Sequence, residues 1–547
     1  MKKTVRIILF SIVLIFSVSS SQAGVIGQSL ESSLQGLNPE DEIAVILTLA
    51  DQLDVKSFKG KNKSLRRSRL NRALRDKADK SQKGLKKFLK EKKARKIKSF
   101  WIFNGMAAAI RADIVDELAQ RPEVQSIQLD AVVSLPAPTL AAAGTPEWNI
   151  DAIKAPMLWE LGYTGTGVVV ANMDTGVDVL HPDLAASYRN DPNSWLDLVS
   201  GSPTPIDPDP PGSIFGGHGT KTMGVMVGGD AGGTSIGVAP GAQWIAVRVF
   251  DSDGNATYTA IHSGYQWLLD PDGNPDTDDL PDVVNNSWGI VDPPEVVGSC
   301  ITEFQTDIQA LKAAGVAMVF SAGNQGPNSH TSVSPANNPE SLAVGSVGQS
   351  MVISDFSSRG PSGCGGDIFP ELVAPGDNVR TTDVSLGGFP NYVPTSGTSI
   401  AAPHVSGAIA LLLSVNPQLT VGDLETLLTD SATDLGIAGW DNDYGKGLLD
   451  VEAANNLIDN NFNSIADGWE LHFFGDLSTA TATSDSDHDY YTDLHEYLNW
   501  RNEELDTEGQ PYDPTVRNAP GGTGYDKPSI LWLTLPAILN SATSQLP

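Results

Sequence analysis

The sequence contains only two cysteines, Cys300 and Cys364, and neither lies in an N-terminal lipidation signal. The chain can therefore form one disulfide at most. Long apolar runs are also scarce, because residues 7–18 and 530–539 are both too short for the roughly 20 residues that cross a bilayer. Basic residues become rare after residue 140, where 11 Lys and Arg face 52 Asp and Glu, a net charge of −41. A membrane anchor is thus disfavoured, and we expect a soluble, strongly acidic body.

The N-terminus has the composition of a secretory signal peptide. Lys2, Lys3 and Arg6 precede the apolar run 7–18, and the small residues Ser21-Gln22-Ala23 follow it. We predict that residues 1–23 are removed and that the protein is secreted, with the periplasm as a possible transit compartment. In an exported protein the pair Cys300 and Cys364 is expected to form a disulfide.

Residues 24–140 form a separate predicted unit of opposite charge. Up to residue 140 there are 25 basic and 14 acidic residues, and this net charge of +11 combines with −41 to give the total of −30. Strands are expected at 42–49, 100–110 (with a turn or bulge at Asn104-Gly105) and 124–133. Helices are expected in the basic segment that ends at residue 98 and over 112–120. This is a small α+β domain. Its basic run, residues 56–98, is compatible with nucleic-acid binding, but we favour an intramolecular acidic partner and expect no nucleic acid.

A small-residue, proline-containing segment, 134–144, is the kind of exposed linker that proteases cut. Beyond it, residues 145–456 alternate apolar strands with helices, which predicts an α/β domain with a largely parallel sheet. One strand, 168–173, ends at Asp174, and such sheets place their chemistry at the carboxyl ends of strands.

Two further motifs complement Asp174. His218 lies in the first turn of a small-residue helix, and Ser399 lies at the start of the apolar helix that follows Gly397. A nucleophilic serine requires a histidine to take its proton and a carboxylate to orient that histidine. Each motif alone is also compatible with an ordinary helix cap or turn.

The segments 174–178, 217–220 and 397–403 together resemble the active-site blocks of subtilisin-like serine peptidases (subtilases, S8 family), in that family's order of Asp, His and Ser. The resemblance implies a three-layer α/β fold with a largely parallel sheet. It also implies that Ser399 is the nucleophile, His218 the general base and Asp174 its orienting carboxylate. Residues 24–140 resemble the family's inhibitory, chaperoning propeptide. The expected function is that of a secreted, monomeric serine endopeptidase that cleaves proteins through an acyl-enzyme and is made as an autoprocessed zymogen.

The same resemblance assigns the remaining site residues. Asn324 is expected to donate its side-chain amide to the oxyanion. Residues 287–289 and 322–323 would form the two walls of the S1 pocket, and the segment 253–258 would be the opposite peptide-pairing edge. The substrate-binding residues implied in this way are Ser287, Trp288, Gly289, Ala322, Gly323, Gly254 and Tyr258. Within the family, Cys300, Cys364 and the segments 285–289 and 356–361 are most similar to the bacillopeptidase F-like branch.

Residues 457–510 are expected to bind structural Ca²⁺. Two twelve-residue loops place oxygen-bearing residues at alternate positions and close with a glutamate, which is the pattern that Ca²⁺ requires. The loops resemble EF-hand or thrombospondin type 3 calcium repeats. The first consists of Asp459, Asn461, Asn463, Ile465, Asp467 and Glu470, and the second of Asp485, Asp487, Asp489, Tyr491, Asp493 and Glu496. Serine and tyrosine replace the usual glycine at Ser464 and Tyr490. Residues 511–547 are expected to be a loosely ordered tail.

Several alternatives stay open at this point. The acidic segment 270–282 could bind calcium or be a solvated loop, and Asp183 matches a family calcium ligand whose partner loop, 228–237, is unusually short. A non-catalytic, calcium-dependent surface protein would lack a catalytic residue, and none is missing. A tripeptidyl exopeptidase would need an additional domain that blocks the cleft.

Overall fold

The computed structural model describes residues 24–60, 62–135, 147–210, 213–461, 463–475, 477–488, 491–501 and 514–515. The predicted signal peptide, most of the linker 134–144 and nearly all of the tail lie outside the described residues. The chain divides into two compact units, the first ending at Asn455 and the second beginning at Asn456.

The N-terminal part of the first unit is a five-stranded sheet in the order β1-β5-β2-β4-β3. Its strands are β1 (Val25–Ile26), β2 (Glu42–Leu49), β3 (Arg95–Phe100), β4 (Gly105–Arg111) and β5 (Val124–Leu129). Its helices are α1 (Gln28–Leu34), the long basic α2 (Lys63–Glu91) and α3 (Val115–Ala119). The predicted α+β unit is therefore present, with β1 and α1 added at its start.

Three boundaries in this unit differ from the sequence prediction. The basic helix α2 ends at Glu91, and the basic residues from Arg95 onward belong to β3. The turn or bulge expected at Asn104-Gly105 within the strand 100–110 is a turn at residues 101–104, and it separates β3 from β4. The last predicted strand is also divided: β5 ends at Leu129, and β6 (Val132–Ser134) leaves the sheet and pairs antiparallel with β10 (Asn255–Thr257).

The larger part of the unit is built on a seven-stranded, wholly parallel sheet in the order β14-β13-β12-β11-β7-β9-β8. Its strands are β7 (Val169–Asp174), β8 (Trp195–Asp197), β9 (Gln243–Arg248), β11 (Val283–Asn286), β12 (Ala317–Ser321), β13 (Leu342–Val347) and β14 (Leu372–Pro375). These strands are nearly continuous apolar runs, as expected for a sheet that helices cover on both faces. The predicted three-layer α/β fold is confirmed.

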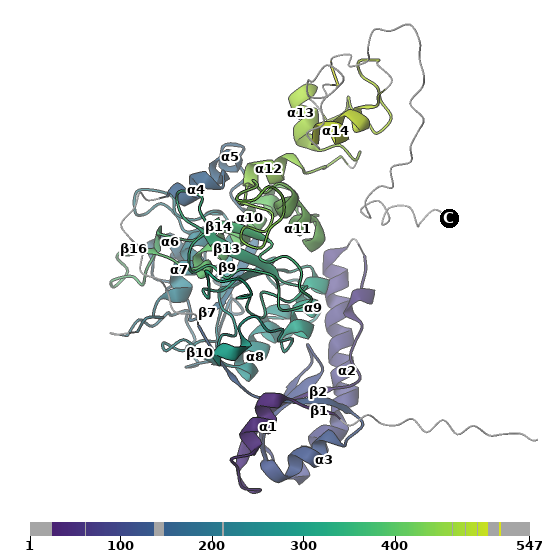
Figure 1. Cartoon of the computed structure of the whole chain (residues 1–547), viewed down its shortest axis with the longest axis vertical. Helices are drawn as coiled ribbons and strands as arrows, with labels where there is room; N and C mark the ends of the chain where they lie inside the picture. Colours follow the sequence, from purple (N-terminus) through teal and green to yellow (C-terminus); the bar gives the residue numbers. More distant parts are fainter. Residues whose placement is uncertain are drawn as a thin grey trace, which may run out of the picture. The chain divides into compact units, whose positions relative to one another are not determined.

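Helices lie around the central sheet (Figure 1). Alternate residues of its strands face different helices. Ala171 and Met173 pack in one core with Ile261 of α8 (Tyr258–Leu269) and with α9 (Gln305–Ala314). On the other face, the Asn172 side-chain amide donates to Thr222 of α7 (His218–Val227), and α10 (Thr398–Val415) packs against α7. The period-two alternation of strand side chains thus places α7 and α10 on the same side of the sheet.

The remaining elements are smaller. A second hairpin pairs β15 (Val379–Thr382) with β16 (Tyr392–Thr395). The other helices of the first unit are α4 (Trp148–Ala152), α5 (Ala155–Glu160), α6 (Pro182–Ala185) and α11 (Val421–Asp430), and α12 (Val451–Asn456) ends at the boundary. The second unit contains α13 (Asp467–Phe473) and α14 (Asp493–Arg501), which meet around the buried indole of Trp469.

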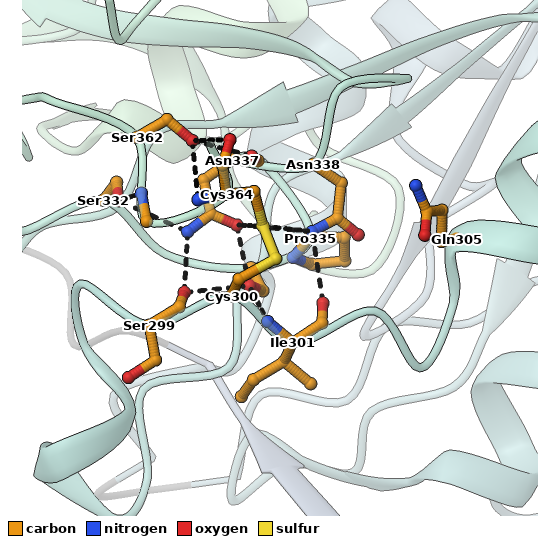
Figure 2. The surroundings of a disulfide bond; sticks show 12 residues. Ser299, Cys300, Ile301, Gln305, Ser332, Pro335, Asn337, Asn338, Ser362 and Cys364 are labelled. Atoms are coloured by element: carbon orange, nitrogen blue, oxygen red, sulfur yellow. Dashed lines mark hydrogen bonds between the residues drawn. A yellow bond between two sulfur atoms is a disulfide. The ribbon is translucent and has the colours of Figure 1, made fainter. Parts of the chain in front are cut away.

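The two cysteines form a disulfide that joins positions 64 residues apart (Figure 2). Neighbouring asparagines extend this link by hydrogen bonds. The Asn337 amide donates to the carbonyl of Ser299 at 2.8 Å, and the hydroxyl of Ser362 donates to the carbonyl of Asn337 at 2.9 Å. The disulfide therefore holds three loop segments together, including the one that leads into β13.

Helix α10 contains a proline in its interior. The helix begins at Thr398, so Pro403 lies beyond its first turn and deprives the carbonyl of Ser399 of its helical partner. The structure supplies a substitute, because the Ser287 hydroxyl donates to that carbonyl at 2.8 Å. With this hydrogen bond, α10 remains continuous and fully packed, and 89% of its 18 residues are buried although it is apolar enough to cross a membrane.

We predict that Ser287→Ala destabilises the protein by about 1–3 kcal/mol, because the buried carbonyl of Ser399 would lose its partner. Chemical denaturation of Ser287→Ala and of the unsubstituted protein measures the difference. Ser406→Ala is the matched control, since this buried serine of the same helix makes only long hydrogen bonds of 3.4 Å. Equal effects of the two substitutions would contradict the assigned role of Ser287.

Candidate active site

Asp174 and His218 meet at the carboxyl end of the central strand. Asp174 is the last residue of β7, and His218 is the first residue of α7, which packs against that strand. His218 Nδ1 lies 2.8 Å from Asp174 Oδ1, and the same oxygen accepts the backbone N–H of Thr175 at 2.7 Å. Both side chains are at least 93% buried. The carboxylate thus fixes the imidazole and its tautomer, leaving Nε2 as the nitrogen that can accept a proton.

Ser399 is the second residue of α10, with its side chain 4% exposed. Its hydroxyl donates to the carbonyl oxygen of Ser287 at 3.2 Å. A catalytic serine commonly has loose hydrogen bonds before substrate binds, so this geometry is compatible with later transfer of the proton to a histidine. The backbone N–H of Ser399 belongs to the first turn of the helix, where N–H groups have no helical partner and attract negative charge.

Asn324 is oriented by the residue that precedes the nucleophile. Its carbonyl oxygen Oδ1 accepts both the backbone N–H of Thr398, at 2.9 Å, and the Thr398 hydroxyl, at 2.8 Å. These bonds direct the amide nitrogen Nδ2 toward Gly397. A Cβ placed on Gly397 would lie 3.4 Å from Nδ2 of Asn324 and 3.7 Å from the backbone nitrogen of Ser399. Two N–H donors therefore converge on a space that glycine leaves open.

The two segments predicted as pocket walls face each other across one buried side chain. A Cβ on Gly289 would lie 2.7 Å from Cγ2 of Val333, and a Cβ on Gly323 would lie 2.8 Å from the same methyl group. Val333 is fully buried. It fills the space between the two walls, and no motif in the sequence marks this residue.

Not every predicted wall residue offers its side chain to this space. The indole of Trp288 lies in the core, edge to face with Phe304 and Phe320. Ala322, the residue that follows β12, is also fully buried. Trp288 can therefore contribute only its backbone to a pocket wall, as a residue of an added-strand edge does.

The predicted edge 253–258 is occupied by the N-terminal region. Ala256 pairs with Val133, and the backbone N–H of Leu135 donates to the carbonyl of Gly254 at 2.7 Å. Tyr258 opens α8, is largely buried and packs in the same core as Val133. The chain segment that precedes the linker thus lies as an antiparallel strand on this edge.

Asp207 is a second buried carboxyl group beside Asp174, and its sequence context gave no signal of this position. It accepts the backbone N–H and hydroxyl of Thr220, two residues after His218, at 2.8 and 2.7 Å. Burial, and to a smaller extent the charge of Asp174, raises the pKa of Asp207 to about 6. Thr175 connects the end of β7 to the first turn of α7, because its hydroxyl accepts the N–H of Gly219 at 2.9 Å.

His404, in the same motif as Ser399, lies elsewhere. It is fully buried, and its ring nitrogens are hydrogen-bonded to Asn149 and to the carbonyl of Ile400. Burial lowers the pKa of His404 to about 4, so this histidine is neutral and structural at physiological pH.

In the second unit, the first predicted calcium loop has a suitable donor set. Glu470 is fully buried, and its carboxylate accepts the side-chain amides of Asn461 at 3.0 Å and Asn463 at 2.9 Å. Rotation of these amides would present their oxygens instead. Ser464 adopts φ +73°, the left-handed conformation that glycine usually provides at this position of an EF-hand loop. Burial raises the pKa of Glu470, and nearby Asp467 and Asp459 contribute to the shift.

The second loop is described only in part. Asp493 and Glu496 are fully buried, and Asp493 accepts hydrogen bonds from Ser484 and Ser486. Asp489 and Tyr490 lie outside the described residues. Elsewhere, the carboxylate of Asp183 accepts the N–H of Ala231 at 2.7 Å and the Tyr392 hydroxyl at 2.6 Å.

Comparison with known proteins identifies both parts of the first unit. Residues 165–447 match the model of the subtilase family, and residues 45–136 match that of the peptidase inhibitor I9 family. Bacillopeptidase F of Bacillus subtilis (strain 168) is 37% identical over 426 residues, which cover 71% of this chain but 28% of that protein. Subtilisin E of the same organism is 33% identical over 371 residues, 68% of this chain and 85% of that protein. Subtilisin of Bacillus pumilus is 34% identical over 309 residues, 56% of this chain and 98% of that protein. The chain belongs to the subtilase family of serine endopeptidases and carries an I9 inhibitor domain before its peptidase domain.

Proposed function

We propose that Ser399, His218 and Asp174 are the catalytic triad of a secreted endopeptidase that processes its own N-terminal domain. The observation that carries this assignment is the 2.8 Å contact between His218 and Asp174, in a chain where Ser399 opens a helix packed against α7. His218 Nε2 would take the proton of Ser399 as the hydroxyl attacks a peptide carbonyl, and would then give it to the leaving amine. Asp174 would stabilise the intervening imidazolium.

The oxyanion would be held in the space beside Gly397. Nδ2 of Asn324 and the backbone N–H of Ser399 converge there, and the two hydrogen bonds from Thr398 hold the Asn324 amide before the reaction begins. Donors that are fixed in advance need no reorganisation as negative charge develops. In enzymes of this family, loss of one such donor costs about 10²–10³ in kcat.

The N-terminal domain, residues 24–135, would act as an inhibitor and as a folding aid. Its last strand, β6, pairs with β10, so that it occupies the edge on which a substrate would lie. Asp130 strengthens this attachment, because its carboxylate accepts the N–H and hydroxyl of Thr259 in the first turn of α8, at 2.9 and 2.8 Å. Cleavage in the linker that follows would leave a bound product that blocks the cleft.

We predict that the secreted wild-type protein loses the N-terminal domain and reacts with a serine-directed fluorophosphonate, whereas Ser399→Ala stays full length and unlabelled. N-terminal sequencing and intact mass after expression with Ca²⁺ measure both properties. Ser406→Ala, in the same helix, is the control and should be processed normally. Retention of the domain and absence of labelling in wild type would contradict the catalytic assignment.

We propose that the enzyme prefers small residues at P1. The Cγ2 methyl group of Val333 lies 2.7 Å from the position of a Cβ on Gly289 and 2.8 Å from that of a Cβ on Gly323, and Val333 is fully buried between the predicted walls. A branched side chain in this position leaves less room for the substrate side chain than a smaller residue would.

We predict that Val333→Gly raises kcat/KM for P1 Phe relative to P1 Ala by about 10–200-fold, since a change of a methylene or more in a pocket is worth about 1–3 kcal/mol. Peptide substrates that differ only at P1 give this ratio. Val344→Gly, which removes a fully buried valine in the neighbouring strand β13, is the control for a general loss of packing. A ratio that does not change in Val333→Gly would contradict the pocket assignment.

We also propose that the second unit binds structural Ca²⁺ through its two loops. The first would use Asp459, Asn461, Asn463, the carbonyl of Ile465, and Glu470, with Asp467 in support. The second would use Asp485, Asp487, Asp489, the carbonyl of Tyr491, and Glu496, with Asp493 in support. The buried carboxylate of Glu470 among two side-chain amides is the observation that favours this proposal. Ca²⁺ would neutralise the negative charge that these carboxylates bring together.

We predict that Glu470→Gln removes about one Ca²⁺ per chain, as measured by calorimetric titration, and lowers the melting temperature of the second unit in Ca²⁺ but not in chelator. The substitution keeps the size and shape of the side chain but removes its charge. Glu452→Gln, in α12, is the control. A Ca²⁺ stoichiometry equal to that of wild type would contradict the loop assignment.

A further inference from the structure

The long helix α2 of the N-terminal domain reaches beyond its own sheet to an acidic segment of the peptidase domain. We call residues 270–282 the acidic insert; it contains six aspartates between α8 and β11. Four cations of α2 pair with four of them: Lys63 with Asp282, Arg67 with Asp278, Arg72 with Asp276, and Arg75 with Asp270. This contact is separate from the pairing of β6 with β10.

Three carboxyl groups of the acidic insert converge on one point. Oxygen atoms of Asp270, Asp272 and Asp279 all lie within 4.8 Å of one another. Ligands at about 2.3–2.6 Å from a shared Ca²⁺ would lie no farther apart than about 5 Å, so the spacing suits that ion.

One member of this cluster is a buried carboxylate with a free oxygen. The side chain of Asp270 is 1% exposed; Oδ2 pairs with Arg75, and Oδ1 is buried without a hydrogen-bond partner. Within the part of the chain that the structure describes, the other two carboxylates, Asp272 and Asp279, accept hydrogen bonds only from groups of the insert itself, including the N–H of Asp272 and the Thr277 hydroxyl. The Arg75 guanidinium group thus contacts a group of carboxylates that still has an oxygen atom without a hydrogen-bond partner.

Departure of the N-terminal domain changes the charge balance of the insert. The four paired cations of α2 leave together, and six aspartates remain within 13 residues. The nearby Arg189 offers little compensation, because it donates to the backbone carbonyl of Asp279 and forms its ion pair with Asp191. Like charges this close repel strongly unless a cation binds.

We propose that Asp270, Asp272 and Asp279 form a Ca²⁺ site of the processed enzyme, and that Arg75 of α2 occupies it in the zymogen. Ca²⁺ and the N-terminal domain then bind in competition, and Ca²⁺ promotes release of the cleaved domain. The release step rests on the proposed autoprocessing; the site itself does not.

The site is tested first without proteolysis. In full-length Ser399→Ala chains, Arg75→Gln removes the guanidinium group from the proposed Ca²⁺ site. Equilibrium dialysis should then show about one additional bound Ca²⁺ per chain. Adding Asp272→Asn and Asp279→Asn should abolish that gain, while each asparagine keeps the shape of the side chain and one acceptor oxygen. Tb³⁺ provides a second readout, because the Trp101 ring lies 4.3 Å from the Arg75 guanidinium and would sensitise an ion in its place. No gain of Ca²⁺ in the Arg75→Gln chain would overturn the proposal.

Release is tested with the processed wild-type protein. The Ca²⁺ concentration is set at about ten times the dissociation constant of Ca²⁺ for the site. The affinity of the enzyme for the cleaved domain, measured by gel filtration, should then be about tenfold weaker than in NaCl of equal ionic strength. Asp272→Asn with Asp279→Asn should remove this response. Asp276→Asn, which loses only the pair with Arg72, should release faster at every Ca²⁺ concentration and keep the response. Equal effects of Ca²⁺ and NaCl would overturn the proposed competition. Absence of cleavage would contradict the proposed autoprocessing, and the Ca²⁺ site would then be decided by the first experiment alone.

Discussion

The parallel pairing of β7, β11 and β12 is the constraint on which the active site depends. Parallel strands end at one edge of a sheet, so Asp174, Ser287 and Asn324, which terminate or follow these strands, are brought to the same edge. The helices α7 and α10 pack against each other on one face and bring His218 and Ser399 to that edge. A change of strand register would therefore separate groups that are far apart in the sequence.

The sequence predicted the elements that bear motifs and missed groups that act only through tertiary contact. Asp174, His218 and Ser399 lie in recognisable local patterns. Asp207 lies 11 residues before His218 in a proline-rich segment, and only folding brings it to Thr220. Val333 likewise has no signal, because its position between two glycines depends on loops that the chain alone does not specify.

Element boundaries failed where long-range pairing decided them. Residues 124–133 alternate like one strand, yet β6 turns away to pair with β10, since the peptidase edge offers backbone partners that β5 does not. Pro403 shows the same limitation in a helix. Local rules exclude an interior proline, but a hydroxyl 112 residues away satisfies the carbonyl that it leaves open.

Ser287 connects two parts of the site that are usually considered separately. It belongs to a predicted wall of the substrate pocket, its hydroxyl holds the carbonyl of Ser399, and its own carbonyl accepts the Ser399 hydroxyl. A substrate side chain that pushed this wall outward would therefore misalign the hydroxyl of Ser399, the proposed nucleophile. The enzyme would then reject oversized residues through a slower chemical step, with binding affected less, and poor substrates would act as competitive inhibitors.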